Sequence, residues 1–185
     1  ANKFASDLKL VSDATLMAVA SRDPHRANEF AKQHEAALVF HSYEALASCE
    51  QVDVIYIATP HGFHHEHALL CLNHKKAVLC EKALALNERQ VLEMVQAANR
   101  NNVFLMFAFW TKFIPQYKKV TEMIQSGEIG ELQMIQADFG FRAAKPTPQR
   151  LYDPVLGGGA LLDIGIYPVF LAASLLGRPL ETKAV

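Results

Sequence analysis

Short apolar runs alternate with stretches of helical periodicity up to about Ala108. The apolar runs are Leu16–Ala20, Leu38–Phe40, Val52–Ala58, Ala77–Cys80 and Val103–Phe107. Apart from Asp53, their interiors are apolar throughout, which is typical of strands covered on both faces. The helical stretches between them are His25–His34, Tyr43–Ser48, His64–Asn73 and Glu88–Asn99. Repetition of strand and helix at this spacing predicts right-handed crossovers and an open parallel α/β sheet.

The helix expected at Glu88–Asn99 carries clear signals at its start. Asn87 is placed to cap it, and Gln90 follows three residues later as a capping-box partner. The positions that fall on one apolar face are Val91, Met94, Val95 and Ala98. A further helix is expected at Ala1–Leu10, before the first apolar run.

The pattern changes after Ala108. The elements expected there are a helix near Pro115–Ser126, a long strand at Leu132–Phe141, and an apolar helix that opens at Gly157–Gly159 and ends near Leu176. A proline-rich connection separates the strand from the last helix. The change predicts two domains, residues 1–107 and residues 108–185.

Composition narrows the function classes. The formal net charge is −1, with 51% hydrophobic and 20% charged residues. A near-neutral chain with no basic patch predicts neither nucleic acid nor an anionic membrane as a partner. No apolar run approaches the roughly 20 residues needed to span a bilayer. The chain has three widely spaced cysteines, which we interpret as buried reduced thiols of a cytoplasmic protein.

Candidate chemistry lies where the strands end, because ligands of a doubly wound sheet bind at the carboxyl ends of its strands. An acidic residue after the first apolar run would bind the ribose hydroxyls of NAD. Ser21 and Arg22 stand there instead and suit the 2′-phosphate of NADP. A solvated loop is the alternative interpretation, and NAD stays possible as the cofactor.

The third apolar run ends in Thr59, Pro60 and His61, and His64 and His67 lie on the next helix. A cluster of histidines invites a metal site, but the H-E-x-x-H spacing of zinc peptidases is absent. We therefore predict no metal, and expect His61 and His64 to line the edge of a pocket.

The fourth apolar run ends in Glu81 and Lys82. A charged pair at the end of a buried strand must be paired or hydrogen-bonded. Its plain interpretation is an ion pair that joins strand to loop. The functional interpretation places Lys82 in a cleft, where a positive charge lowers the pKa of a nearby phenol.

Asp163 and Tyr167 lie four residues apart and so share one face of the last helix. The Gly157–Gly159 run before them allows close approach of the backbone to a ligand or to a neighbouring element. A tyrosine near a lysine is a credible general acid or base for moving a hydroxyl proton. A core tyrosine with a satisfied hydroxyl is the alternative.

Together these features resemble the glucose–fructose oxidoreductase, inositol dehydrogenase and rhizopine-catabolism (Gfo/Idh/MocA) family. The motifs that carry the resemblance are Ala58–Pro60 with His64, Leu79–Lys82, Trp110–Phe113 and Gly157–Tyr167. Within the family the chain is most similar to the branch of dimeric dihydrodiol dehydrogenases and NADP-dependent D-xylose dehydrogenases. That branch has a tyrosine where inositol dehydrogenases have a histidine.

The resemblance implies a Rossmann domain followed by an α/β domain whose open sheet makes the subunit contact. It implies that the cofactor is held by Ser21 and Arg22 at its adenosine end, by a loop of Thr59, Pro60, His61 and His64, and by Glu81 and Lys82 at the nicotinamide ribose. Trp110 would lie beside cofactor and substrate. Tyr167 would donate or accept the proton, with Asp163 beside it in the substrate pocket.

The chain departs from the family pattern at several places. The G-x-G-x-x-G turn and the first strand are absent, and Ala1–Phe4 corresponds to the segment that comes directly after that turn in the family. Val185 precedes most of the second sheet, so we expect both domains to be incomplete in this chain. Ala83 stands where a proline is usual after Glu-Lys, and Lys112 where an arginine is common.

The sequence thus predicts a cytoplasmic, homo-oligomeric oxidoreductase that transfers a hydride between NADP and a sugar or diol. Lys82 and Tyr167 would be its catalytic residues. Two alternatives stay open: a sensor of the same fold that binds dinucleotide or sugar without turnover, and a metal-dependent hydrolase built on His61, His64 and His67.

Overall fold

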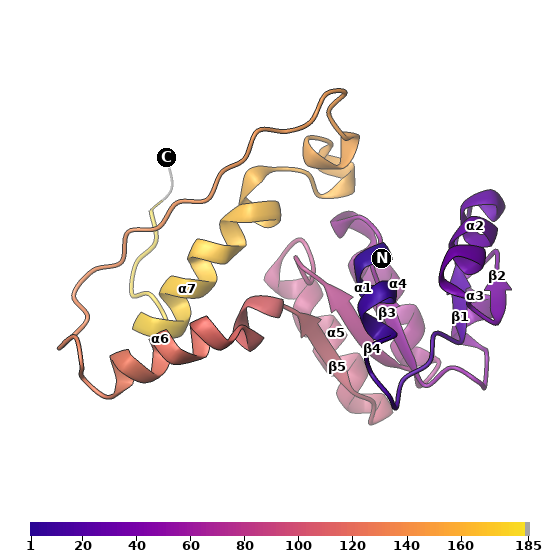
Figure 1. The fold of residues 1–185 in the computed structure, drawn as a ribbon, viewed down its shortest axis with the longest axis horizontal. Coiled ribbons are helices and arrows are strands. Elements are labelled where there is room, and N and C mark those ends of the chain that lie inside the picture. The colour runs from indigo at the N-terminus through magenta and orange to yellow at the C-terminus, as the bar shows by residue number, and fades with distance from the viewer. Residues whose placement is uncertain (184–185) are drawn as a thin grey trace.

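The computed structural model describes residues 1–183, which form short parallel strands, covering helices and a helical extension (Figure 1). The strands are β1 (Ala18–Ala20), β2 (Leu38–Phe40), β3 (Val54–Ile57), β4 (Ala77–Glu81) and β5 (Leu105–Ala108). The α-helices are α1 (Asn2–Leu8), α2 (Pro24–His34), α3 (Tyr43–Ala47), α4 (His64–Asn73), α5 (Glu88–Asn101), α6 (Pro115–Gln125) and α7 (Ile166–Leu176). The expected alternation of strands and helices up to Ala108 is confirmed.

All strand pairs are parallel, as the sequence predicts. β1 pairs with β2, and β4 pairs with both β3 and β5, with Glu81 opposite Ala108 at the end of the last ladder. The strands form two ladders instead of one sheet, since no described strand joins β1 to β3. The carboxyl ends of β3 and β4 still lie side by side, and this edge carries the candidate site.

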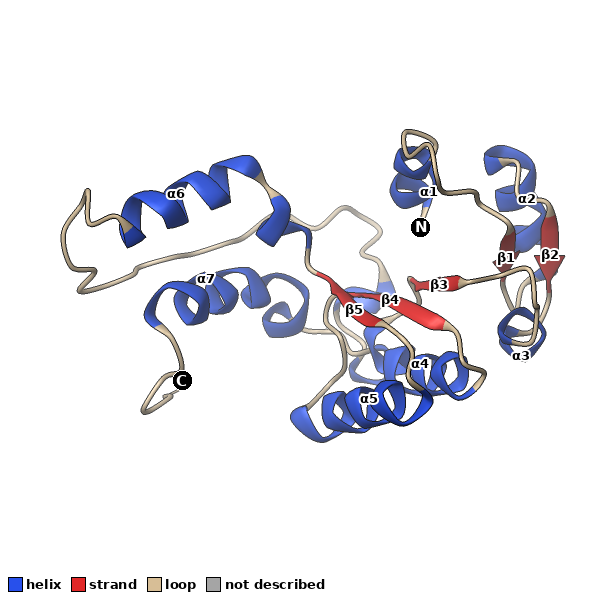
Figure 2. Cartoon of the chain, turned by 90° about the horizontal axis from the view of Figure 1, so that it is seen from below, coloured by secondary structure: helices blue, strands red, loops and turns tan. Residues whose placement is uncertain are grey.

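The core lies on one face of the β3–β4–β5 sheet, beneath α4 and α5 (Figure 2). Ile55 and Val78 point into it and are buried, whereas Val54 on the other face is 56% exposed. That other face is covered near Tyr56, whose ring stacks on Phe4 of α1 with 3.8 Å between centroids. The expectation of strands covered on both faces is therefore wrong for the described residues, because α1 covers only part of the second face.

The start of α5 shows the expected cap in a shifted form. The Asn87 side chain accepts a hydrogen bond from the Gln90 amide at 3.0 Å. The Gln90 side chain accepts from the Leu86 amide, also at 3.0 Å, and not from Asn87 as in a standard capping box. Two amides at the helix start are thus satisfied, and the loop after β4 is tied to α5.

The long strand expected at Leu132–Phe141 is wrong. Residues 132–141 run as a connection without regular secondary structure. A strand needs a neighbour to share its backbone hydrogen bonds, and none lies beside this segment among the described residues. Its apolar side chains are partly exposed, among them Met134 and Phe139.

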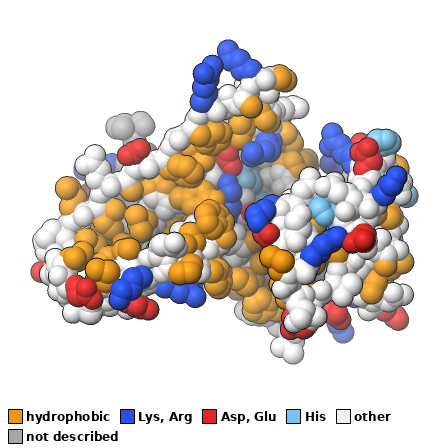
Figure 3. Space-filling view, viewed as in Figure 1, with side chains coloured by type: hydrophobic (Ala, Val, Ile, Leu, Met, Phe, Trp, Pro, Cys, Tyr) orange, Lys and Arg blue, Asp and Glu red, His pale blue; other side chains and the backbone are white. Residues whose placement is uncertain are grey.

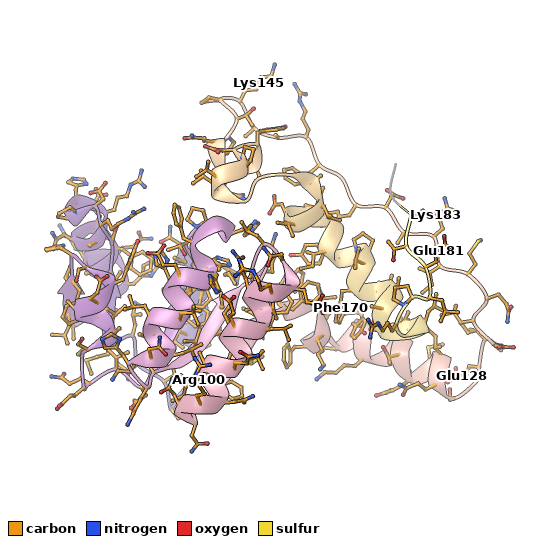
Figure 4. The ribbon with its side chains drawn as sticks, turned by 180° about the vertical axis from the view of Figure 1, so that it is seen from behind. Arg100, Glu128, Lys145, Phe170, Glu181 and Lys183 are labelled. Carbon is orange, nitrogen blue, oxygen red and sulfur yellow. The ribbon has the colours of Figure 1, made fainter. Side chains whose placement is uncertain are left out.

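The apolar helix expected to end near Leu176 is present as α7, which begins at Ile166. It packs on the end of the sheet through aromatic rings. Phe170 of α7 contacts Phe109, which follows β5, at 4.4 Å between centroids, and Tyr117 of α6 at 5.5 Å. Figure 4 shows Phe170 between α7 and the neighbouring helix. Because Phe109 is only 4% exposed, this cluster fixes the start of α7 against the sheet.

One described segment, Pro154–Leu176, is long and apolar enough to span a membrane by length and composition alone. Its mean hydropathy reaches 1.8, so the expectation that no apolar run has this length needs correction. This length is not evident from the sequence because Gly157–Gly159 interrupts the series of larger apolar side chains. The segment also contains Asp163, which forms an ion pair with Lys82 directly after β4, and none of its apolar window is buried in the structure.

Candidate functional site

A pocket of about 390 Å³ opens at the carboxyl ends of β3 and β4. Figure 3 shows basic, acidic and histidine side chains beside a hollow in the middle of that face. The pocket is lined by Ala1, Tyr56, Ala58, Thr59, Pro60, His61, Glu81, Lys82, Arg150, Leu156 and Asp163. Most of the residues predicted from the sequence to bind the cofactor line this pocket, so it lies at the strand ends where a ligand site was expected.

Lys82 and Asp163 form the central ion pair of the pocket. The Lys82 ammonium donates to Asp163 Oδ1 at 2.7 Å and also to the Asp163 backbone carbonyl. Both side chains are mostly buried, at 17% and 14% exposed. Burial would raise the pKa of Asp163, but the hydrogen bond and charge of Lys82, with Arg150, outweigh it and hold that pKa below its ordinary value.

Tyr167 lies against the same lysine. The Lys82 ammonium is 5.5 Å from the centroid of the Tyr167 ring, within range of a cation–π contact. The Tyr167 hydroxyl accepts a hydrogen bond from Trp110 Nε1 at 3.2 Å, and Phe109 packs on the ring at 5.3 Å. Tyr167 therefore adjoins the pocket through Lys82, and Trp110 contacts Tyr167 in turn, although neither is part of the pocket lining.

The backbone around Asp163 differs from the regular α-helix that its spacing to Tyr167 suggests. Leu161–Gly165 form a π-helical turn that runs into α7, a feature often found at functional sites. Asp163 and Tyr167 still face the same partner, since both contact Lys82. The shared face predicted by the sequence is thus present with a wider turn.

The expected close approach of the glycine run is confirmed. Gly157 has a φ of +75°, and a Cβ there would lie 2.7 Å from the His61 Cβ. A Cβ on Gly158 would meet the backbone of Tyr152 at 2.8 Å. A side chain at position 157 would push this segment away from the loop after β3, and one at position 158 would disrupt the turn at Tyr152 and Asp153.

His64 connects the two loops that form the pocket floor. It is fully buried, and its Nδ1 and Nε2 lie 2.7 Å from the carbonyl oxygens of Ala83 and Thr59. Burial lowers the pKa of His64, and this effect exceeds the opposite effect of the two carbonyls. Because each ring nitrogen lies against a carbonyl of a different loop, His64 links the two loops, and the neutral ring donates to one of these carbonyls at a time.

Replacing His64 with leucine is expected to lower the free energy of unfolding by roughly 1–3 kcal/mol, because a buried carbonyl loses its hydrogen-bond donor. Urea denaturation followed by circular dichroism measures the change. The matched control is His25→Leu, since His25 has a side chain 80% exposed. Equal stability of the two variants would contradict a linking role for His64.

The other histidines have separate partners. His61 Nδ1 lies 3.2 Å from the Gly157 carbonyl oxygen, and His67 Nδ1 lies 3.0 Å from Thr59 Oγ1. Burial lowers the pKa of His67. Among residues 1–183, no group of three histidine, cysteine or acidic side chains is arranged to hold a metal ion.

Glu81 is held on both carboxylate oxygens. Tyr56 donates its hydroxyl hydrogen bond to Glu81 Oε1, and the Lys82 amide donates to Oε2 at 3.2 Å. Burial raises the pKa of Tyr56 above its ordinary value, and the hydrogen bond to Glu81 raises it further. Tyr56 therefore stays a neutral donor. Tyr56 was not predicted from the sequence, because a tyrosine inside an apolar run looks like a core residue.

Ser21 and Arg22 lie away from this pocket. Arg22 lines a second pocket of about 500 Å³ formed with His41–Glu44 and α4. Its guanidinium lies 5.4 Å from the Phe63 ring centroid. Ser21 accepts from the Asp23 amide, which precedes α2. The structure therefore separates Ser21 and Arg22 from the Lys82 pocket, and of the two only Arg22 lines the second pocket.

Arg150 is a second residue that the sequence analysis missed. It lines the first pocket, and its Nη1 lies 3.6 Å from Asp163 Oδ1. No local pattern singles out an arginine in a proline-rich connection, since its partner stands 13 residues further along a turn whose shape the sequence does not specify.

Two family models match the chain. A model described as an oxidoreductase family with an NAD-binding Rossmann fold matches residues 1–109. A model of the GFO/IDH/MocA C-terminal domain matches residues 117–185.

Curated relatives agree with these matches. Trans-1,2-dihydrobenzene-1,2-diol dehydrogenase of Mus musculus is 41% identical over 189 residues, covering 100% of this chain and 56% of the relative. The Xenopus laevis enzyme of that name is 44% identical over 157 residues, 85% of this chain and 47% of the relative. An NADP(+)-dependent scyllo-inositol 2-dehydrogenase of Bacillus subtilis is 36% identical over 99% of this chain and 57% of its own length. The chain thus spans about half the length of the curated relatives it matches.

A similar solved structure is a 3-ketoreductase from Actinomadura kijaniata in complex with NADP and TDP-benzene. It is 32% identical, with a TM-score of 0.87 over 94% of this chain and 53% of that protein. The resemblance stated from the motifs is therefore confirmed, including the similarity to dihydrodiol dehydrogenases. The chain belongs to the Gfo/Idh/MocA family of oxidoreductases.

Proposed function

We propose that the full-length protein is an NADP-dependent dehydrogenase that oxidises a hydroxyl of a sugar or diol, or reduces the matching carbonyl. The observation that carries this proposal is the contact of Lys82 with both Asp163 and Tyr167 beside a pocket at the strand ends. The relatives named for diols, inositol and a ketone reduction support the choice of substrate class.

The residues at the site fit a nicotinamide dinucleotide. Thr59, Glu81 and Lys82 line one pocket with oxygen and nitrogen atoms suited to a ribose. Arg22 lines the other pocket together with Glu44 and Glu66, and its guanidinium donors suit a phosphate. Thr59 is bonded to His67, which lines the second pocket, so the two sites are neighbours on one edge.

In the proposed reaction, the Tyr167 oxygen takes the proton of the substrate hydroxyl during oxidation and returns it during reduction. The positive charge of Lys82 stabilises the tyrosinate, which is the form that accepts the proton during oxidation and the form left after donation during reduction. Asp163 orients the Lys82 ammonium through the bond at 2.7 Å. The cofactor supplies a hydride acceptor at C4 of its nicotinamide ring.

The test of this function is turnover of NADP⁺ by the full-length protein with a panel of aldoses and vicinal diols. Reduction of NADP⁺ by at least one compound is expected, measured as absorbance of NADPH. Tight binding of dinucleotide without turnover of any compound would favour the sensor alternative over the enzyme.

Replacing Arg22 with alanine is expected to raise the KM for NADP⁺ roughly 10–100-fold, since a charge-assisted hydrogen bond to phosphate is lost. The KM for NAD⁺ should stay unchanged, because NAD⁺ lacks that phosphate. Arg26→Ala is the matched control, since Arg26 is exposed and pairs with Asp23 at 3.5 Å. Equal losses for both cofactors would argue against Arg22 as the phosphate ligand.

Three further expectations stay predictions. A domain boundary near residues 107 and 108 is supported by separate family matches to residues 1–109 and 117–185. Homo-oligomerisation is supported by the hydrophobic side chains gathered over the α6–α7 part in Figure 3. The cytoplasmic location rests on the reduced cysteines alone, of which Cys71 and Cys80 are buried.

A further inference from the structure

Arg150 is a cation at the pocket that neither the motifs nor the proposed mechanism uses. Its Nη1 is 3.6 Å from Asp163 Oδ1, the same oxygen that binds the Lys82 ammonium at 2.7 Å. One carboxylate oxygen thus faces two cations, and the shorter contact belongs to Lys82. The other acidic lining residue, Glu81, is already bonded to Tyr56 and to the Lys82 amide.

The Arg150 side chain therefore keeps most of its N–H donors free. A guanidinium has five of them in a planar fork, and the side chain is 55% exposed. The only described carboxylate within 4.0 Å is that of Asp163. Donors that face a pocket without partners are available to oxygen atoms of a ligand.

The backbone that carries Arg150 is fixed. Gln149–Leu151 form a turn whose Leu151 carbonyl accepts from the Gly159 amide at 2.9 Å. The Gly158 amide donates to the Asp153 carbonyl at 2.8 Å. Although the connection rises to Lys145 at its tip (Figure 4), its end at Arg150 is thus tied to the glycine run beside the pocket.

We infer that Arg150 binds the hydroxyl oxygen on the carbon next to the reacting carbon, and so selects substrates with two vicinal hydroxyls. Lys82 and Arg150 lie within 4.0 Å of one carboxylate oxygen, so they can hold neighbouring oxygens of one small molecule. An arginine fork suits this task because its paired N–H groups match paired oxygens. The inference rests on the proposed function and names its substrate class.

The test compares kcat/KM for cyclohexane-1,2-diol and for cyclohexanol in the full-length protein at saturating NADP⁺. The wild type is expected to favour the diol, and Arg150→Ala to lower kcat/KM for the diol roughly 10–100-fold, mainly through KM, with cyclohexanol changed little. Arg150→Lys keeps the charge but not the fork, and should recover only part of the preference. Arg142→Ala is the matched control, since Arg142 is an exposed arginine of the same connection.

The outcomes separate this inference from the proposed function. Absence of turnover with every diol in the wild type would contradict the proposed function itself. Turnover of the diol with equal losses for both substrates in Arg150→Ala would overturn the inference alone. So would a raised KM for NADP⁺ with the diol preference intact, because that result would assign Arg150 to the cofactor.

Discussion

Replacing Tyr167 with phenylalanine is expected to lower kcat of the full-length protein roughly 10²–10⁴-fold, the usual contribution of a general acid or base. The change removes only the hydroxyl. The ring keeps its packing on Phe109 at 5.3 Å and its place under the Lys82 ammonium. Because the fold and the charged pair are retained, the loss should appear in the chemical step.

The measurement is kcat in both directions, together with the dissociation constant for NADPH from fluorescence titration. Binding of NADPH should stay within about twofold, since the hydroxyl contacts only Trp110 among the described residues. Tyr152→Phe is the matched control, because Tyr152 is 69% exposed and lies outside the pocket lining. A Tyr167→Phe enzyme with nearly normal kcat would refute the role of Tyr167.

The strand ends were predictable from the sequence because parallel strands bring their carboxyl ends to one edge. Continuous apolar runs followed by Thr59 and by Lys82 sufficed to place both residues at the pocket. The approach of Lys82 to Tyr167 was expected from the motifs, whereas the ion pair of Lys82 with Asp163, 81 residues away, was not predicted. Long-range contacts of this kind depend on how α7 packs, which periodicity does not describe.

The failures have physical reasons too. The Leu132–Phe141 segment has the composition of a strand, but composition does not supply a neighbour for its backbone hydrogen bonds. Tyr56 alternates with buried neighbours in β3, so its bond to Glu81 is invisible without the sheet. The position of Arg150 depends on a turn whose backbone is hydrogen-bonded to the glycine run, and that turn has no sequence signature.

Replacing Lys82 with alanine is expected to have two separable effects. Turnover should fall roughly 10²–10³-fold, because the positive charge beside Tyr167 is lost from the reacting site. Stability should also fall, by roughly 1–3 kcal/mol, because the mostly buried Asp163 carboxylate loses its main partner. Arg150, at 3.6 Å and more exposed, replaces only part of that interaction.

The stability effect has a defined pH dependence. Lys82 holds the pKa of Asp163 below its ordinary value, so the pair stabilises the fold above the pKa that Asp163 has when unfolded. This contribution is lost as the pH falls through the lowered pKa of the folded state. Urea titrations should therefore show wild type and Lys82→Ala differing at pH 7 and converging once the pH falls below the ordinary pKa range of aspartate.

Asp163→Asn combined with Lys82→Ala distinguishes chemistry from structure. The double variant removes the unpaired carboxylate, so its stability should return most of the way to that of the wild type. Its turnover should stay as low as that of Lys82→Ala, because a neutral amide restores no positive charge beside Tyr167. Recovery of both properties would show that Lys82 only neutralises Asp163. Recovery of stability alone would assign to the Lys82 charge a direct part in the reaction, since the fold, the pocket and the Tyr167 hydroxyl are the same in both variants.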